Sequence, residues 1–209
     1  MKTLILSSKG QFITPDNVDR FLPKKLSACK IAYIITASQK SINPDYLEIH
    51  RKKMDELHLS YTEMDIAGKN EAELEKMFSS YDIILVGGGN TFYLLKAVRE
   101  SGFENVIKKL IAKGVVYIGS SAGAYIACPS IIMATWTQRN PDRYNITEYT
   151  GMNLVPFLIN AHYTPDELEF LKEKTKNLPY PLHTLNNEQA LVVQDEKIQL
   201  IGKGDNLVL

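Results

Sequence analysis

A serine set between two glycines is the first feature of this chain that could carry chemistry. The motif G-S-S-A-G at residues 119–123 follows the apolar run 115–118 and precedes a short helix-like segment. A strand that turns sharply into a helix through small residues is typical of a nucleophile elbow, where the serine hydroxyl stands above the sheet and nearby N–H groups stabilise an oxyanion. A tight turn without chemistry fits the same pattern. We therefore treat Ser121 as a candidate nucleophile that requires a base.

The chain has four histidines that could supply this base. His162 ends a strand-like run just before a predicted helix, and we take it as the candidate general base. His50 and His58 lie among charged residues in or just after a predicted helix and are expected to be solvated. His183 lies in or beside a predicted strand and is expected to be a core histidine.

A glycine-rich loop at residues 87–89, followed by Asn90, comes directly after an apolar strand-like segment. Glycines permit positive φ angles and let a backbone approach a ligand closely. No Lys-Ser/Thr pair follows, and Phe92 stands where a dinucleotide-binding loop has its last glycine, so neither nucleotide motif fits. Two interpretations stay open: a phosphate-binding turn at a helix N-terminus, or a loop whose N–H forms an oxyanion hole together with that of Ala122.

The composition is that of an ordinary globular protein. Lys plus Arg and Asp plus Glu are both 24, so the formal net charge is zero and we expect neither a nucleic acid nor a membrane as a partner. No apolar stretch approaches the roughly 18 residues needed to cross a bilayer, and the apolar start of the chain is too short for a signal peptide. Cys29 and Cys128 lack the spacing of a zinc site and are expected to be buried free thiols in a cytoplasmic protein.

Strand-like and helix-like segments alternate through the first two thirds of the chain. This pattern predicts an α/β fold of three layers, with a mostly parallel sheet and helices on both faces, in a single domain over residues 1–209. The expected strands are Thr3–Ser7, Lys30–Thr36, Ser60–Met64, Asp82–Val86 and Val115–Ile118. The expected helices are Asp16–Leu26, Pro44–Leu57, Asn70–Phe78, Thr91–Glu100 and Phe103–Lys113. Such sheets bind ligands at the carboxyl ends of their strands, and the glycine loop and the serine elbow follow strands that we expect to be neighbours.

The last third of the chain changes character. Residues 136–149 are polar and turn-rich, which predicts a loop or a flap. Thr164–Lys176 has the start signals of a helix, with Thr164 as N-cap, Pro165 next and Glu167 as the capping-box residue. Two short segments around residues 190–193 and 198–202 predict a hairpin, and residues 205–209 predict a closing strand.

Three segments resemble the S51 serine peptidases, the family of the aspartyl dipeptidase peptidase E, which is related to cyanophycinase. They are V-G-G-G-N-T-F at residues 86–92, Y-I-G-S-S-A-G-A at residues 117–124 with A-C-P at 127–129, and N-A-H-Y-T at residues 160–164. The resemblance covers nearly the whole chain. It implies a fold similar to class I glutamine amidotransferases, cleavage after an N-terminal aspartate in small peptides, no metal or other cofactor, and a monomer or homodimer.

The resemblance also implies roles for individual residues. Ser121 corresponds to the nucleophile and His162 to the general base. The oxyanion and substrate-binding positions correspond to Gly88 or Gly89, Asn90 and Ala122.

One departure from the family concerns the third member of the triad. Peptidase E has a glutamate there, whereas this chain has Asn187, with Glu188 one residue later. An asparagine orients a histidine by a hydrogen bond but does not stabilise an imidazolium by charge, and the loss of that charge costs about 10⁴ in rate in a serine protease. Both residues stay candidates for orienting His162.

A second departure concerns recognition of the substrate aspartate. Ile132 stands where the family has an arginine, and Trp136 stands where an aspartate follows. A substrate carboxylate favours a bidentate cation, so aspartyl specificity stays open. Arg139 and Arg143, in the polar segment, are candidate replacements.

We therefore expect a serine peptidase in which Ser121 and His162 meet at the carboxyl rim of a single sheet. The alternative is a binding or regulatory protein that keeps the elbow and turns over little or nothing. A nucleotide-binding protein comes third, because no lysine follows the glycines.

Overall fold

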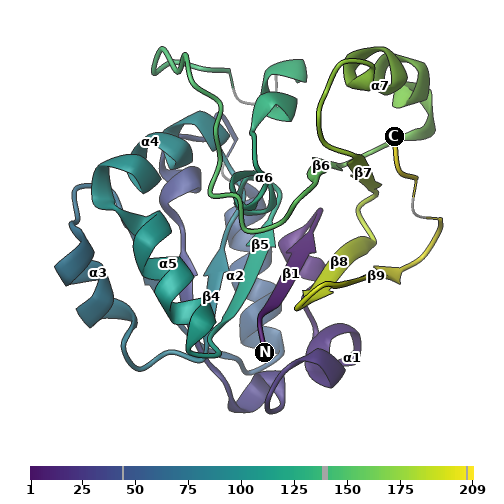
Figure 1. The fold of residues 1–209 in the computed structure, drawn as a ribbon. Helices are drawn as coiled ribbons and strands as arrows, with labels where there is room; N and C mark the ends of the chain where they lie inside the picture. Colours follow the sequence, from purple (N-terminus) through teal and green to yellow (C-terminus); the bar gives the residue numbers. More distant parts are fainter. Residues whose placement is uncertain (44, 138–140, 206) are drawn as a thin grey trace.

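The computed structural model describes residues 1–43, 45–137, 141–205 and 207–209. Its centre is a sheet of seven strands in the order β3-β2-β4-β5-β1-β8-β9 (Figure 1). The strands are β1 (Thr3–Ser7), β2 (Lys30–Ile34), β3 (Ser60–Met64), β4 (Ile83–Val86), β5 (Val116–Ser120), β8 (Gln189–Gln194) and β9 (Lys197–Gly202). The first five strands in this order pair in parallel, whereas β8 is antiparallel to β1 and β9 is antiparallel to β8.

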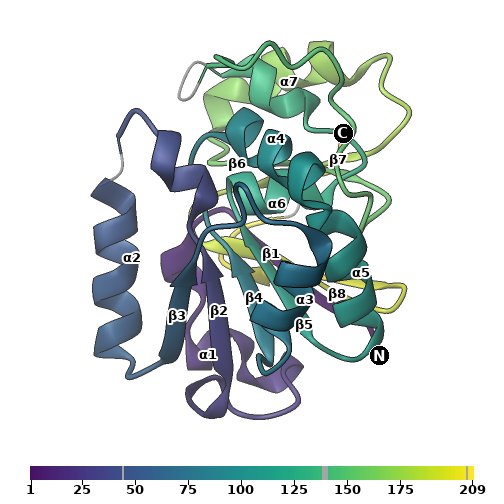
Figure 2. The same cartoon turned by 90° about the vertical axis from the view of Figure 1, so that its left-hand side faces the viewer.

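The central strands are buried on both faces, which is why their sequences are apolar throughout. In β1, Leu4 and Leu6 pack into one hydrophobic cluster, whereas Ile5 between them packs into the other. The first cluster includes α3 (Glu71–Phe78), α4 (Thr91–Ser101), α5 (Phe103–Ala112) and α6 (Ala122–Ala127), and the second includes α1 (Pro15–Val18) and α2 (Asp45–Glu56). Figure 2 shows α2 on one side of the sheet and α3 and α5 on the other. The predicted three-layer α/β fold with helices on both faces is confirmed.

Strands β4 and β5 are parallel neighbours, and Val86 lies opposite Gly119 in their register. The glycine loop that follows β4 and the elbow that follows β5 therefore emerge side by side at the same edge of the sheet, as the sequence predicts.

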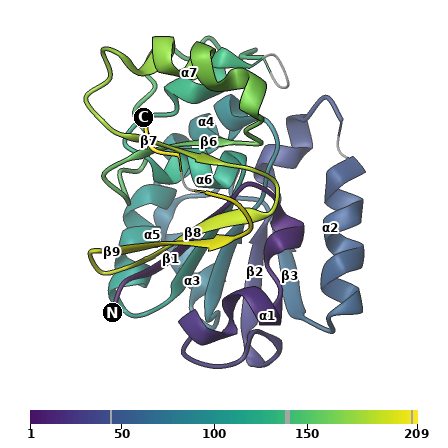
Figure 3. The ribbon, with the colours of Figure 1, turned by 90° about the vertical axis from the view of Figure 1, so that its right-hand side faces the viewer.

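A second, two-stranded sheet lies above this edge of the central sheet (Figure 3). It pairs β6 (Leu158–Ala161) with β7 (Leu182–Leu185) in parallel, and α7 (Leu168–Thr175) lies between them in the chain. The Ala161 N–H donates to the Tyr125 hydroxyl of α6 at 3.2 Å, which fixes the small sheet to the elbow helix. The expectation that Ser121 and His162 share the rim of a single sheet is therefore wrong, because His162 follows β6 in the separate small sheet.

Two further predictions of elements are wrong. The helix expected over residues 16–26 ends at Val18, and two separate 3₁₀ turns follow it. Pro23 does not allow the helix to continue. The Asp19 carboxylate accepts from the Leu26 N–H at 2.7 Å, which turns the chain back. The described residues 207–209 form no strand, although Val208 makes a single antiparallel bridge to His183. The predicted hairpin is confirmed as β8 and β9. The Thr164 N–H donates to the Glu167 carboxylate at 3.0 Å, at the predicted helix start.

Candidate active site

The elbow holds Ser121 in a backbone conformation that side chains rarely adopt. Its φ is 51° and its ψ is −107°, a strain of about 1–3 kcal/mol. The Ser121 N–H donates to the Ser7 carbonyl at 3.0 Å, which fixes the turn to β1. A Cβ at Gly123 would lie 2.1 Å from the Val86 carbonyl oxygen, and one at Gly119 would lie 2.5 Å from that of Gly123, so both glycines are required by close packing. The G-x-S-x-G pattern thus follows from the geometry of the turn.

His162 lies within hydrogen-bonding distance of this serine. Its Nε2 is 3.0 Å from the Ser121 Oγ. The His162 backbone has a φ of 64°, and its N–H donates to the Ser8 hydroxyl at 2.7 Å. Ser8 is buried and directly follows β1, the strand that pairs with β5. The structure therefore brings together two side chains that are 41 residues apart in the sequence, although they come from two different sheets.

The other ring nitrogen of His162 contacts Asn187. The Asn187 Oδ1 lies 2.7 Å from His162 Nδ1. An amide oxygen only accepts, so Nδ1 carries the proton and Nε2 is left as an acceptor facing Ser121. In this tautomer the Ser121 hydroxyl donates to the imidazole, which is the arrangement that a general base requires.

Glu188, the other sequence candidate for this position, is exposed on the adjoining turn. Its N–H donates to the Asn186 Oδ1 at 2.8 Å, and within the described contacts its carboxylate does not reach His162. The geometry therefore favours Asn187 as the residue that orients the imidazole.

Sequence reasoning did not single out Ser8. Its hydroxyl lies 3.4 Å from both His162 Nδ1 and Asn187 Oδ1. A signal was present, because Ser8 is a polar residue immediately after a strand that ends at the ligand-binding edge of a parallel sheet.

The backbone amides of Gly88 and Ala122 lie close to Ser121. A Cβ at Gly88 would lie 3.3 Å from the Ser121 Cβ and 3.8 Å from its Oγ, so the glycine loop touches the elbow directly. The N–H groups of Gly88 and Ala122 donate no hydrogen bond to any of the residues that the structure describes. Of the predicted oxyanion positions, Gly88 and Ala122 thus lie next to the serine with N–H groups that make no described hydrogen bond, and Gly89 also lines the cavity.

The Asn90 side chain is bonded within the protein, whereas the sequence predicts an oxyanion or substrate-binding position there. It is only 1% exposed and caps α4, where its Oδ1 accepts from the Tyr93 N–H at 2.9 Å and its Nδ2 donates to the Pro141 carbonyl at 3.2 Å. Its amide is fully engaged in shaping the loop, and it is not among the described residues that line the cavity next to Ser121.

A cavity of about 890 Å³ opens beside the serine. Ser8, Ser121 and His162 line it, and so do Tyr33, Tyr46 and His50. Among the described lining residues, Lys9 is the one cation and Asp45 the one carboxylate. The volume falls in the range of small-molecule pockets.

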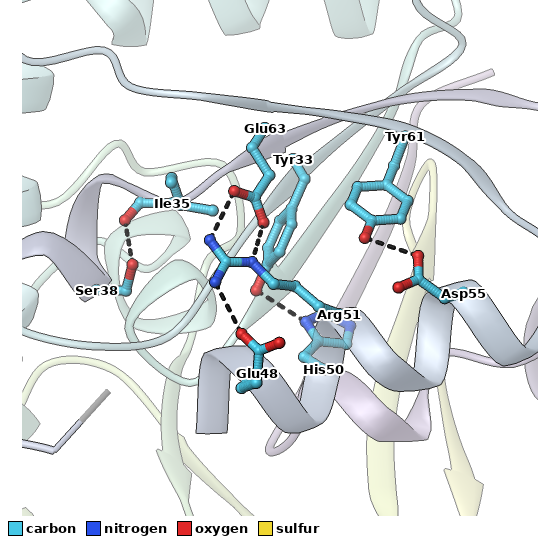
Figure 4. Close-up of polar contacts among 9 residues, drawn as sticks. All are labelled: Tyr33, Ile35, Ser38, Glu48, His50, Arg51, Asp55, Tyr61 and Glu63. Atoms are coloured by element: carbon cyan, nitrogen blue, oxygen red, sulfur yellow. Dashed lines mark hydrogen bonds and ion pairs between the residues drawn. The ribbon is translucent and has the colours of Figure 1, made fainter. Parts of the chain in front are cut away.

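His50 is buried rather than solvated, which corrects the sequence-based prediction. It is 4% exposed, and its Nδ1 lies 2.9 Å from the Tyr33 hydroxyl (Figure 4). Burial lowers the pKa of His50 to about 4 and raises the pKa of Tyr33. The charged neighbours of His50 in the sequence suggested an exposed helix face, but Arg51 points away to Glu63, at 2.5 Å, while His50 points inward against Gly10.

The remaining histidines and cysteines have the places that the sequence predicts. His58 is exposed, and His183 is buried with its ring 4.7 Å from that of Phe157. Cys29 and Cys128 are buried free thiols, and burial raises the pKa of Cys128 to about 12, so it is not an activated nucleophile.

The segment that departs from the family contributes to the cavity without a described cation. Ile132 and Trp136 are half-buried, and the cavity is lined from this segment by Ala134 and Thr137. Arg139 lies outside the described residues. Arg143 is exposed and is not among the described lining residues.

Two features of other kinds of site are absent from the described residues. No three His, Cys, Asp or Glu side chains gather there as metal ligands would. Among the same residues, no helix has the length and apolar character required to cross a membrane.

This fold and this site belong to a known class of enzymes. The model of Peptidase family S51 matches residues 4–201, so the chain belongs to that family and is a peptidase.

The individual relatives point to the same class. The uncharacterized peptidase Lin0382 of Listeria innocua is 30% identical over 203 residues, with 95% of each chain covered. Peptidase E of Nostoc sp. is 30% identical over 153 residues, which is 73% of this chain and 59% of that protein. The crystal structure of a Listeria monocytogenes protein provisionally assigned to peptidase E superposes with a TM-score of 0.83 at 30% identity, over 98% of this chain and 100% of that one.

Proposed function

We propose that this peptidase is a serine peptidase that hydrolyses small peptides, namely N-terminal Asp-X dipeptides or a closely related substrate. The observation that carries the proposal is the hydrogen-bonded chain from Ser121 through His162 to Asn187, with distances of 3.0 Å and 2.7 Å. A nucleophile and a base in hydrogen-bonding contact, with the base oriented by a third group, are the recurring signature of covalent acyl transfer.

The first half of the reaction forms an acyl-enzyme. The Ser121 Oγ attacks the scissile carbonyl carbon while its proton passes to His162 Nε2. Negative charge then develops on the carbonyl oxygen, where the N–H groups of Gly88 and Ala122 stabilise it. When the tetrahedral intermediate collapses, the C–N bond breaks and His162 returns the proton to the leaving amine.

The second half releases the acid. A water molecule attacks the ester carbonyl and gives its proton to His162, and the ester bond to Ser121 breaks as the serine recovers that proton. Throughout, Asn187 holds the proton on His162 Nδ1, so that Nε2 stays available as the base. Because an asparagine is neutral, it supplies orientation without the charge stabilisation of an aspartate or glutamate.

The substrate is proposed from the charges of the cavity. Lys9 is exposed and adjoins Ser8, and it is positioned to bind a substrate carboxylate. Asp45 provides a carboxylate for a substrate ammonium group. A short peptide with a free amino group and an acidic side chain or carboxyl terminus satisfies both.

A second candidate function is a peptide-binding or regulatory protein with little or no turnover. The neutral Asn187 beside His162 and the Ile132 in place of the family arginine favour it. It keeps the same cavity and the same ligand class but lacks a fast chemical step.

The sequence also suggests the domain extent, the location, the oligomeric state and the partners of the proposed enzyme. We propose that residues 1–209 form one peptidase E-like domain that acts in the cytoplasm as a monomer or homodimer on small peptides, without a nucleic acid partner. The family match over residues 4–201 supports the single domain.

The proposal is tested with a panel of dipeptides that carry N-terminal Asp, Asn, Glu or a neutral residue. Wild type and Ser121→Ala are assayed side by side for release of the free amino acids. The proposal predicts turnover of at least one acidic dipeptide by wild type and its loss in Ser121→Ala. Equal rates in the two proteins would remove Ser121 as the nucleophile, whereas binding without turnover in wild type would support the second candidate.

A further inference from the structure

The glycine loop after β4 is held by the segment between β2 and the first turn of α2. The Gly87 N–H donates to the Ile34 carbonyl at 3.0 Å, and the Asn90 N–H donates to the Ala37 carbonyl at 2.9 Å. Gly89, with a φ of 138°, lies so close that a Cβ there would be 2.3 Å from the Ala37 carbonyl. Both ends of the loop are therefore fixed by backbone groups, not by side chains.

Gly88, in the middle of this loop, is held by a side chain. Its carbonyl accepts a hydrogen bond from the Tyr46 hydroxyl at 2.8 Å. Gly88 is also the loop residue that touches Ser121. Glycine has the least restricted backbone of all residues, so an amide aimed at a reacting atom requires an external anchor if it is to stay in one orientation.

The Tyr46 hydroxyl is suited to this task. Tyr46 lies in the first turn of α2, is half-buried and lines the cavity. Burial raises the pKa of Tyr46, so its hydroxyl keeps its proton and donates throughout the neutral range. The rest of α2 is packed against the sheet through Leu47 and Met54, which gives the hydroxyl a rigid base.

We propose that Tyr46 is a positioning residue for the oxyanion hole: by holding the Gly88 carbonyl, it fixes the peptide unit that follows the Gly88 Cα, so that Gly88 stays beside Ser121 and its N–H can stabilise the oxygen that becomes negative there. The inference rests on the proposed function, because it requires acyl transfer at Ser121. The oxygen carries its charge in the transition state rather than in the bound substrate, so the contribution appears in kcat and not in KM.

The test compares Tyr46→Phe with Tyr61→Phe. Both substitutions remove one hydroxyl, but the Tyr61 hydroxyl bonds the Asp55 carboxylate at 2.9 Å (Figure 4), and Tyr61 is not among the described residues that line the cavity. Loss of an oxyanion donor costs about 10²–10³ in kcat, and a loosened donor costs less. We therefore expect about a 10-fold lower kcat for Tyr46→Phe, with KM changed by less than about twofold, and wild-type kinetics for Tyr61→Phe.

A second readout follows the oxyanion site directly. A peptide boronic acid forms a tetrahedral adduct with a serine, and one of its oxygens occupies the oxyanion position. Its affinity should fall in Tyr46→Phe by the same factor as kcat, whereas the affinity of a product dipeptide should not change. A melting temperature for each variant checks folding, and Tyr46→Leu serves as the second variant if Tyr46→Phe does not fold.

The possible results distinguish a failure of the positioning role of Tyr46 from a failure of the proposed function. If Ser121→Ala is inactive and Tyr46→Phe has the kcat of Tyr61→Phe, the positioning role is wrong and the proposed function stands. A raised KM with unchanged kcat would also overturn the role, because Tyr46 would then contact the substrate. If Ser121→Ala retains full activity, or wild type forms no adduct with the boronic acid, the proposed function fails and the positioning role fails with it.

Discussion

The two histidines of the cavity, His162 and His50, show how position decides what an imidazole can do. His162 is half-buried at the end of β6, with one nitrogen 3.0 Å from the Ser121 hydroxyl and the other 2.7 Å from Asn187. His50 is a buried residue of α2, bonded to the Tyr33 hydroxyl at 2.9 Å, with its pKa lowered to about 4. His162 has the Ser121 hydroxyl as a proton donor at one nitrogen and the Asn187 Oδ1 as an acceptor at the other, as a general base requires. His50 has the surroundings of a structural residue, and it stays neutral.

The largest expected effect separates these two histidines in catalysis. In His162→Gln the peptidase rate should fall by about 10³–10⁴, because the serine loses the base that activates it. In His50→Gln the rate should fall by less than about tenfold, because this ring lines the cavity without touching Ser121. Steady-state kinetics on the best dipeptide measure both. A loss of rate in His50→Gln as large as that in His162→Gln would contradict the assignment of His50 as a structural residue.

The next effect concerns the stability of the fold against acid. His50 titrates near pH 6.5 when unfolded and near pH 4 in the fold, so the unfolded chain binds more protons between these values. The contribution of His50 to the free energy of unfolding is complete above about pH 6.5. It is lost as the pH falls towards 4, and the loss is about 3 kcal/mol.

Urea unfolding at pH 7.5 and pH 4.5 measures this dependence. Between the two pH values, the free energy of unfolding should fall more for wild type than for His50→Gln. The difference should be most of the loss of about 3 kcal/mol. His58→Gln is the matched control, since His58 is exposed just after the end of α2, and this variant should lose as much stability as wild type. The same loss in wild type and in His50→Gln would show that His50 ionises freely in the fold.

A smaller effect is expected at the residue that orients His162. In Asn187→Asp a carboxylate faces His162 Nδ1 and stabilises the positive charge that the ring acquires in the transition state, so kcat should rise by about tenfold. Glu188→Gln is the control and should leave kcat unchanged, because Glu188 is exposed and the described contacts give the orienting bond to Asn187. A fall in the Glu188→Gln rate together with no gain in Asn187→Asp would assign the orienting role to Glu188.

The smallest effect concerns the charge at the mouth of the cavity. In Lys9→Gln the KM for dipeptides with an N-terminal Asp should rise by up to about fivefold, since an exposed ion pair is worth about 0–1 kcal/mol. The KM for a neutral dipeptide should not change. Lys25→Gln, at an exposed lysine that is not among the described lining residues, is the matched control. A rise of equal size for neutral and acidic substrates would exclude charge recognition by Lys9.

The sequence predicts one half of this site better than the other. Gly88, Ala122 and Ser121 follow two adjacent buried strands, and the alternation of apolar runs and helices suffices to predict that they meet at one sheet edge. The burial of His50 was not predictable in this way, because its neighbours in the sequence are charged and only tertiary packing turns its ring inward against Gly10.

The other half depends on contacts that no local pattern encodes. The small sheet that carries His162 forms by pairing two distant segments, and its separation from the central sheet is a matter of long-range packing. The choice of Asn187 over Glu188 depends on the direction of side chains in a turn, which a shift of one residue changes. Ser8 and Tyr46 were missed for the same reason, since each acts through a contact with a distant backbone group.

The most direct test of the account is covalent labelling of the serine. Wild type is treated with a serine-directed fluorophosphonate, weighed intact, and digested to locate the modified peptide. An activated nucleophile predicts one adduct per chain on Ser121, absent from Ser121→Ala, much slower in His162→Gln and close to the wild-type rate in His50→Gln. An unlabelled wild-type protein, or an adduct on another residue, would contradict the claim that Ser121 and His162 form a catalytic pair.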